Sequence, residues 1–183
     1  EWTGRMESWR DITHTHLMAF TATMGLTIDH VYISGMQHIT TEDVLAALPD
    51  LTDSSGNLIR GTIPIFAVSL PELQMQIEGL GWIRQANIER RLPNSLHIFL
   101  KERKPRAIWQ YQEELMLIDG EGEQITGYHL SDHNDLPVIV GKDILGHAPS
   151  LLAFLESEPT LQDEVDAAIR ISDRRWDIRL RNG

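Results

Sequence analysis

The stretch WIRQANIERRLPNSLHIFL, residues 82–100, contains the clearest structural signal in the chain. Apolar residues occupy alternate positions on both sides of its centre: Trp82, Ala86, Ile88, Leu96, Ile98 and Leu100. Side chains point to opposite faces along a β-strand, so this period of two indicates two strands that each have one buried face. The intervening residues 92–95, Leu-Pro-Asn-Ser, have the composition of a turn. The stretch therefore predicts a β-hairpin.

The residues before this hairpin predict one further strand and two helices. Residues 27–35 alternate in polarity and end at a glycine, which indicates a half-buried strand. Thr40 is expected to cap a short helix, because a hydroxyl can accept a hydrogen bond from the free amides of the first turn. Ser69 and Glu72 have the spacing of a second capping site, a capping box. The helix that follows should bury one apolar stripe: Leu70, Leu73, Ile77 and Leu80.

After Pro105 the pattern changes to short strands and turns. Strands are predicted at residues 107–111, 115–118, 125–129, 136–140, 165–171 and 176–180. One helix is expected after Pro149, with Leu151, Leu152 and Leu155 on its buried face. In the strand at residues 165–171, Val165, Ala167, Ile169 and Ile171 should share a face. The predicted fold class is α+β, in which a small β-α-α-β-β domain precedes a mostly antiparallel β domain with one or two helices.

Composition narrows the possible functions. The chain has 183 residues, a 42% hydrophobic content, a net charge of −11 and no cysteine. These values fit one or two globular domains, exclude disulfides and thiolate metal sites, and argue against a dedicated nucleic-acid binder. Two segments are nevertheless basic: residues 84–106 have seven basic and two acidic side chains, and residues 170–181 have five arginines and two aspartates. Such segments suggest contacts with acidic partners, or else simply solvated strand faces.

A series of motifs resembles one known family. Residues 31–35 (VYISG), 80–83 (LGWI) and 89–96 (ERRLPNSL) are similar to the POTRA domain of the bacterial cell division family FtsQ/DivIB. Residues 101–109 (KERKPRAIW), 117–122 (LIDGEG), 136–141 (LPVIVG) and 174–180 (RRWDIRL) resemble the motifs that follow in that family, in the same order. Each motif is weak alone, but together they cover about residues 25–183.

The resemblance implies a location, a domain layout and partners. It implies a single-pass protein of the cell inner membrane with this region in the periplasm, and an anchoring helix that precedes it. Residues 1–26 are expected to be a juxtamembrane linker with a short helix, residues 27–105 the POTRA domain, and residues 106–183 a β domain that lacks its last strands. The family's role is that of a divisome scaffold that binds FtsB and FtsL, with FtsK, FtsW and FtsI as further possible partners. The alternative is a POTRA-type module of outer-membrane protein assembly or transport.

The candidate binding residues are Arg174, Arg175 and Trp176, which precede or begin a predicted strand. An arginine pair can make bidentate contacts with carboxylates, and the resemblance implies that basic residues here contact FtsB. The competing interpretation is that the arginines are simply exposed and that the tryptophan packs into the core.

No catalytic residues, metal ligands or cofactor are expected. The pair His14 and His16, and the pair His129 and His133, each lack a third ligand at motif spacing, although zinc sites use three or four. No phosphate-binding loop or nucleophile motif is present in the sequence. The chain is therefore expected to bind other proteins and not to act as an enzyme.

Overall fold

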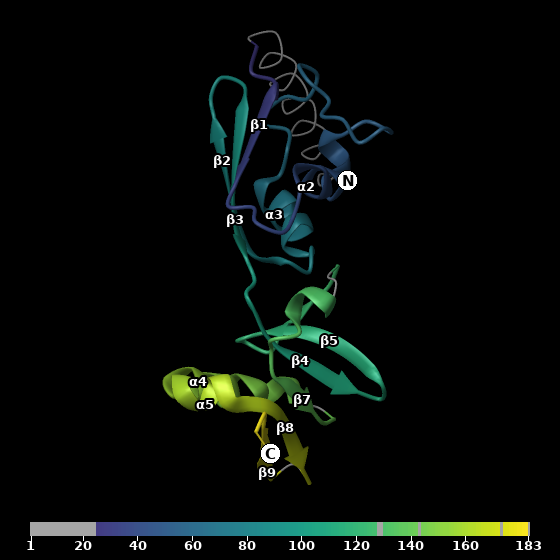
Figure 1. The fold of residues 1–183 in the computed structure, drawn as a ribbon. Coiled ribbons are helices and arrows are strands. Elements are labelled where there is room, and N and C mark those ends of the chain that lie inside the picture. The colour runs from purple at the N-terminus through teal and green to yellow at the C-terminus, as the bar shows by residue number, and fades with distance from the viewer. Residues whose placement is uncertain (1–24, 128–129, 143, 173, 183) are drawn as a thin grey trace, which may run out of the picture. The chain divides into compact units, whose positions relative to one another are not determined.

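The computed structural model describes residues 25–127, 130–142, 144–172 and 174–182. The chain divides into two compact units, the first ending at Glu102 and the second beginning at Arg103 (Figure 1). Most of the expected juxtamembrane linker with its short helix, up to residue 24, lies outside the described residues, as do His14, His16 and His129. Among the described residues, no helix combines the length and apolar character needed to cross a bilayer.

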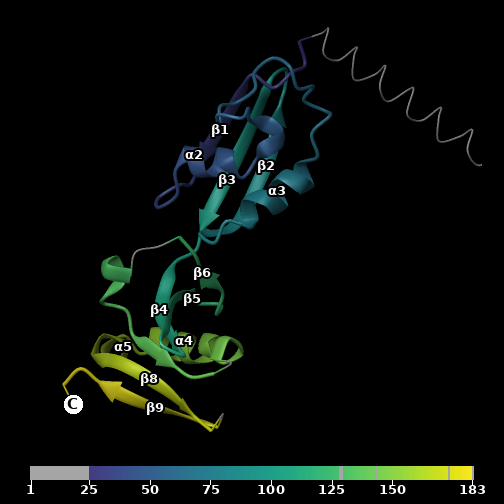
Figure 2. The ribbon, with the colours of Figure 1, turned by 90° about the vertical axis from the view of Figure 1, so that its right-hand side faces the viewer.

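The first unit is a three-stranded sheet with helices on one face (Figures 1 and 2). Its elements are β1 (His30–Ser34), α2 (Thr41–Ala46), the 3-10 helix η1 (Pro49–Leu51), α3 (Leu70–Glu78), β2 (Ile83–Arg91) and β3 (Ser95–Glu102). The strand order is β1-β3-β2, in which β3 is parallel to β1 and antiparallel to β2. The predicted hairpin is confirmed, with Ile88 opposite Ile98 and Ala86 opposite Leu100.

Burial in the first unit agrees with the predicted faces. Leu73 and Ile77 are the buried residues of α3, and they join Ile88, Leu96 and Ile98 in one hydrophobic core. Trp82 is also buried, but it precedes β2 and stacks on the His38 ring at 4.5 Å. The strand therefore contributes Ile83, and not Trp82, to the core, because the β2–β3 register is irregular between Ile83 and Gln85.

The two helix starts differ from each other. Thr40 forms a complete capping box with Asp43, in which the Asp43 amide donates to the Thr40 hydroxyl and the Asp43 carboxylate accepts from the Thr40 amide. The capping box predicted at Ser69 and Glu72 is wrong, since the Ser69 side chain makes no capping hydrogen bond. Pro71 lies in this first turn and has no amide hydrogen, so a capping side chain has one donor fewer to satisfy there.

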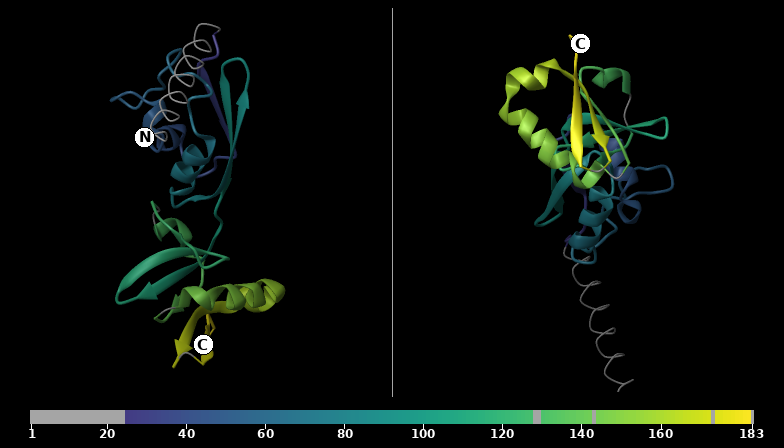
Figure 3. Two further views of the ribbon diagram at one scale, coloured as in Figure 1. Left: turned by 180° about the vertical axis from the view of Figure 1, so that it is seen from behind. Right: turned by 90° about the horizontal axis from the view of Figure 1, so that it is seen from below.

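The second unit is a six-stranded sheet with two helices (Figures 1 and 3). Its strands are β4 (Pro105–Tyr111), β5 (Glu114–Asp119), β6 (Gln124–Ile125), β7 (Val138–Val140), β8 (Val165–Ile171) and β9 (Arg175–Leu180). Its helices are α4 (Ala148–Ser157), α5 (Pro159–Glu164) and the 3-10 helices η2 (Leu130–His133) and η3 (Ile144–Gly146). The α+β fold class is confirmed, as is the helix with buried Leu151, Leu152 and Leu155.

The order of this sheet is β6-β5-β4-β7-β8-β9. The β4–β5, β5–β6 and β8–β9 pairs are antiparallel, whereas the short β7 is parallel to both of its neighbours, β4 and β8. The strand predicted at residues 125–129 is wrong as far as residue 127, because β6 ends at Ile125 and Gly127 has a φ of 75°, whereas residues 128 and 129 lie outside the described residues. Backbone in that left-handed region does not continue a strand.

The predicted single face of β8 is also wrong. A register irregularity lies between Val165 and Ala167, so that Val165 pairs with Leu180 and Ala168 pairs with Ile178. Val165 and Ala168 consequently belong to the core beneath α4, together with Trp109 and Ile139. Ala167 is buried as well but lies outside that core. One inserted residue thus moves the apolar set of a strand to the other face of the sheet.

A buried carboxylate fixes the last residues of the first unit. The Glu102 side chain is 6% exposed and accepts hydrogen bonds from the Gln37 amide at 2.6 Å, the Ile39 amide at 3.2 Å and the His38 ring Nδ1 at 2.8 Å. Burial alone raises the pKa of Glu102, but these hydrogen bonds together outweigh it, so its pKa lies below the ordinary value of 4.5. Gly35, just upstream, has a φ of 90°, and a Cβ there would collide with the Leu100 carbonyl.

A second buried carboxylate fixes the first residue of the second unit. The Asp119 side chain is 5% exposed, and its Oδ2 lies 2.7 Å from the Arg103 guanidinium. Its Oδ1 accepts from the amides of Glu121 and Glu123, both at 2.9 Å. The consecutive residues Glu102 and Arg103 are therefore each anchored inside a different unit.

Candidate partner-binding site

The β8–β9 hairpin positions the three residues that the sequence singled out. Ser172 and Arg174 have turn conformations between its strands, and the Arg174 amide donates to the Ile171 carbonyl at 3.0 Å. Arg175 is the first residue of β9 and lies opposite Ile171, while Trp176 lies opposite Arg170. Within the described residues β9 is the last strand of the sheet order, and this end of the sheet is called the β9 edge below.

The two arginines are exposed at the turn. The Arg175 side chain is 72% exposed, and its Nε lies 3.1 Å from Asp177 Oδ1 in a pair that is itself open to solvent. Such surface pairs contribute little to stability, because water screens both charges. The Arg175 side chain can therefore change partner without a large cost to the fold.

Trp176 has a different environment. It is half-buried and packs against the core beneath α4, and the Arg170 guanidinium lies 5.1 Å from its ring centroid. Because residues i and i+1 of a strand point to opposite faces, Trp176 and Arg175 do not share a face. The structure thus leaves both Arg174 and Arg175 exposed, and it places Trp176 on the side of the sheet that carries the core.

Sequence reasoning missed two other residues of this edge. Arg179 lies on the face of Arg175 and forms an ion pair with Asp166 at 2.6 Å. Ile178 lies on the face of Trp176 and is 39% exposed, which makes it one of the large hydrophobic residues that the fold leaves uncovered. The alternation Arg175, Asp177, Arg179 in the sequence is the signal that could have found the charged face.

In the part of the chain that the structure describes, no three His, Asp or Glu side chains cluster closely enough to hold a metal ion. What the edge offers is main-chain hydrogen-bonding groups, exposed guanidinium groups and a partly covered apolar strip. This combination suits the addition of an extended or helical segment of another protein.

Each half of the chain matches a model of a known protein family. Residues 26–103 match the model of the POTRA domain of FtsQ type, and residues 107–183 match that of the FtsQ/DivIB C-terminal domain of cell division proteins. The chain belongs to the FtsQ/DivIB family of cell division proteins.

Individual FtsQ proteins are similar over most of the chain. The cell division protein FtsQ of Rickettsia felis is 34% identical over 91% of this chain and 59% of its own length. That of Caulobacter vibrioides is 30% identical over 88% of this chain and 51% of its own. That of Zymomonas mobilis is 31% identical over 100% of this chain and 54% of its own. The chain therefore spans somewhat more than half of the length of these FtsQ relatives.

Proposed function

We propose that this chain is the periplasmic part of a non-catalytic divisome scaffold, held at the inner membrane by a single helix and binding FtsB and FtsL. The observation that carries the proposal is the β9 edge, where two exposed arginines adjoin a half-buried tryptophan. Membership of the FtsQ family supports a role in cell division. It also favours this role over the alternative of outer-membrane protein assembly.

The proposed mechanism is docking at a strand edge. A partner segment adds a strand at this end of the sheet, next to the last of the strands that the family resemblance places after β9, and this pairing supplies affinity. The acidic side chains of the segment contact Arg174 and Arg175, which supplies specificity. The Trp176 and Ile178 side chains form the apolar part of the contact. FtsK, FtsW and FtsI are further candidate partners, and no nucleic acid is expected because the chain is strongly acidic.

Calorimetric titration with the FtsB–FtsL periplasmic segments tests the proposal. The double variant Arg174→Glu with Arg175→Glu should weaken binding by about 2 kcal/mol or more if either guanidinium is desolvated in the complex. Rim charges would lose less than about 1 kcal/mol and would show a strong dependence on salt.

Arg91→Glu is the matched control. Arg91 is also an exposed strand arginine, and it pairs with Glu89 two residues away at 2.8 Å, as Arg175 pairs with Asp177. The control should bind like the unchanged chain. An unchanged affinity of the double variant, or an equal loss in Arg91→Glu, contradicts the assignment of the site.

A further inference from the structure

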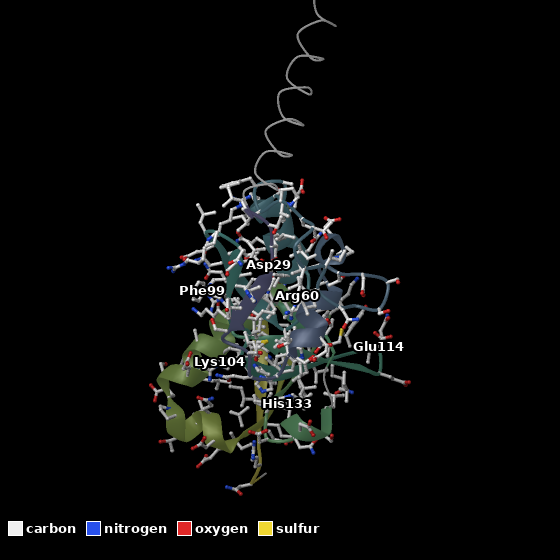
Figure 4. All side chains as sticks on the ribbon, turned by 90° about the horizontal axis from the view of Figure 1, so that it is seen from above. Asp29, Arg60, Phe99, Lys104, Glu114 and His133 are labelled. Carbon is white, nitrogen blue, oxygen red and sulfur yellow. The ribbon has the colours of Figure 1, made fainter. Side chains whose placement is uncertain are left out.

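One end of the first unit combines exposed apolar side chains with arginines. We call it the proximal end, because it contains the first described residues of the chain. It consists of residues 25–29, 59–66 and 90–95, which are joined by hydrogen bonds. The Ile28 amide donates to the Ile63 carbonyl at 2.9 Å, and the Asn94 side chain donates to the Asp29 carboxylate at 2.9 Å. Figure 4 is the view from above onto this end, with Asp29 and Arg60 labelled.

Two large apolar side chains of the proximal end do not pack into the hydrophobic core. Leu92, between β2 and β3, is 59% exposed, and Phe66 is 45% exposed. Both lie outside the hydrophobic core of the first unit. The Arg90 guanidinium lies 5.8 Å from the Phe66 ring centroid, which places Phe66 beside the hairpin. Uncovered apolar residues that gather at one place indicate a contact surface.

The charge around these side chains is positive, although the chain as a whole has a net charge of −11. The proximal end contains three arginines and one aspartate, Asp29, which gives it a net charge of +2. The Arg90 guanidinium donates to the carbonyls of Ile65 and Val68, and these neutral acceptors leave its charge uncompensated. Arg60 is exposed, and Arg91 forms an exposed pair with Glu89.

We propose that the proximal end binds an anionic lipid surface. The Leu92 and Phe66 side chains enter the interface between headgroups and acyl chains, and Arg60 and Arg91 contact headgroup phosphates. An aromatic and an aliphatic side chain surrounded by arginines are the groups that interfacial binding requires. Leu92 lies in the turn between β2 and β3, and Phe66 lies beside the same hairpin. Apolar side chains at a turn can enter a deformable lipid surface.

The proposal implies one orientation of the first unit at the lipid surface. His30 pairs with Ser95 at the proximal end, and β3 runs from there to Glu102 at the opposite end. The strands therefore lead away from the lipid surface, and the Ser34 end stays remote from it. This contact is independent of the β9 edge, because it uses only residues of the first unit.

Site-specific fluorescence tests the contact directly. The chain has no cysteine, so Thr62→Cys and Ser34→Cys each provide a unique site for an environment-sensitive dye. Vesicles that contain phosphatidylglycerol should shift the emission of the dye at position 62 to the blue and leave the dye at position 34 unchanged. Vesicles of phosphatidylcholine alone should shift neither. No shift at position 62, or equal shifts at both positions, overturns the proposal.

Vesicle sedimentation with substituted chains tests the residues. Removing each of Arg60 and Arg91, as Arg60→Gln and Arg91→Gln, should lower the partition coefficient about fivefold at low salt. Leu92→Ser together with Phe66→Ser should lower it about tenfold or more. Circular dichroism of every variant should match that of the unchanged chain, since these side chains lie outside the core.

Two controls separate this surface from general effects of charge and hydrophobicity. Lys101→Gln removes one exposed positive charge toward the opposite end of β3, and Met75→Ser removes an exposed apolar side chain of α3. Both should leave the partition coefficient unchanged. If either control lowers binding as much as the corresponding variant, or if the proximal variants bind normally, the lipid contact is not at this end.

Discussion

The two units of the chain build their sheets in different ways. The sheet of the first unit depends on a hairpin, β2–β3, whose strands are separated by only three residues. The second unit places β7 between β4 and β8, which precede and follow it in the sequence by more than twenty residues. Local pairings have a small loop-closure cost, whereas distant pairings depend on the whole core to hold them. The first unit is therefore the one that should fold by itself.

The two units nevertheless stabilise their residues next to the junction, Glu102 and Arg103, by the same kind of interaction. A buried carboxylate accepts backbone amides and one side chain in each case, Glu102 with His38 and Asp119 with Arg103. The two carboxylates differ in their position in the chain. Glu102 is itself a residue of the junction, whereas Asp119 lies at a turn and forms an ion pair with the junction residue Arg103. Each carboxylate should therefore act on the stability of its own unit.

The largest expected effect comes from dividing the chain. We propose domain boundaries at residues 27–105 for the POTRA domain and 106–183 for the β domain. A fragment with residues 27–105 should fold, giving a cooperative thermal transition and a mixed helix and sheet circular dichroism spectrum. A disordered spectrum would show that the first unit needs the second.

The next largest effect is expected from shortening a side chain in the core of the first unit. Leu73→Ala or Ile77→Ala should lower the free energy of unfolding of the first unit by about 2–5 kcal/mol, because each leaves a cavity in a close-packed core. Met75→Ala is the control on the same helix, since Met75 is 65% exposed. Chemical denaturation followed by circular dichroism measures the three variants. A similar loss in Met75→Ala would refute the assigned helix face.

The junction carboxylates should have a smaller effect. Glu102→Ala leaves the amides of residues 37–39 without their acceptor and should cost the first unit about 2–3 kcal/mol. Asp119→Ala should cost the second unit a similar amount, because the buried Arg103 loses its counter-ion. Hydrogen exchange can assign each loss to its unit. Loss of protection in both units from either variant would contradict separate anchoring.

Acid should weaken the first unit. Asp43, Asp53, Glu78 and Glu102 each have a pKa below the ordinary value, and all four lie in the first unit. A carboxyl whose pKa is lower in the folded state contributes stability above its unfolded pKa, and that contribution is lost as the pH falls through the folded pKa. Urea unfolding at pH 7 and near pH 3 should show the first unit weakened by acid, and Glu102→Gln should reduce this dependence.

The smallest expected effect concerns the helix caps. Thr40→Ala should cost about 1 kcal/mol, because it removes a capping hydroxyl that is in use. Ser69→Ala should cost less than about 0.5 kcal/mol, because the Ser69 side chain makes no capping bond. Thermal unfolding of the two variants provides the comparison. Equal losses would indicate that the Ser69 hydroxyl caps α3 in solution.

The candidate site was partly predictable. The pattern at residues 174–180 was enough to place a strand with two arginines at its start, since alternation and charge are properties of neighbouring residues. It did not indicate that Asp177 and Asp166 pair with Arg175 and Arg179. Nor did it indicate that Arg170 lies against Trp176, a contact that depends on the register of β8 with β9.

The sequence by itself determined the hairpin, the buried faces of α3 and α4, the fold class and the family, because periodicity, caps and motif order are local properties. The tertiary structure decided the rest. It placed β7 parallel to both β4 and β8. It also determined which residues of β8 face the core, because a register irregularity lies between Val165 and Ala167. It also joined Glu102 to the amides of residues 37–39, more than sixty residues away. Hydrogen bonds between distant segments form only when the whole core closes, and no local pattern of residues encodes them.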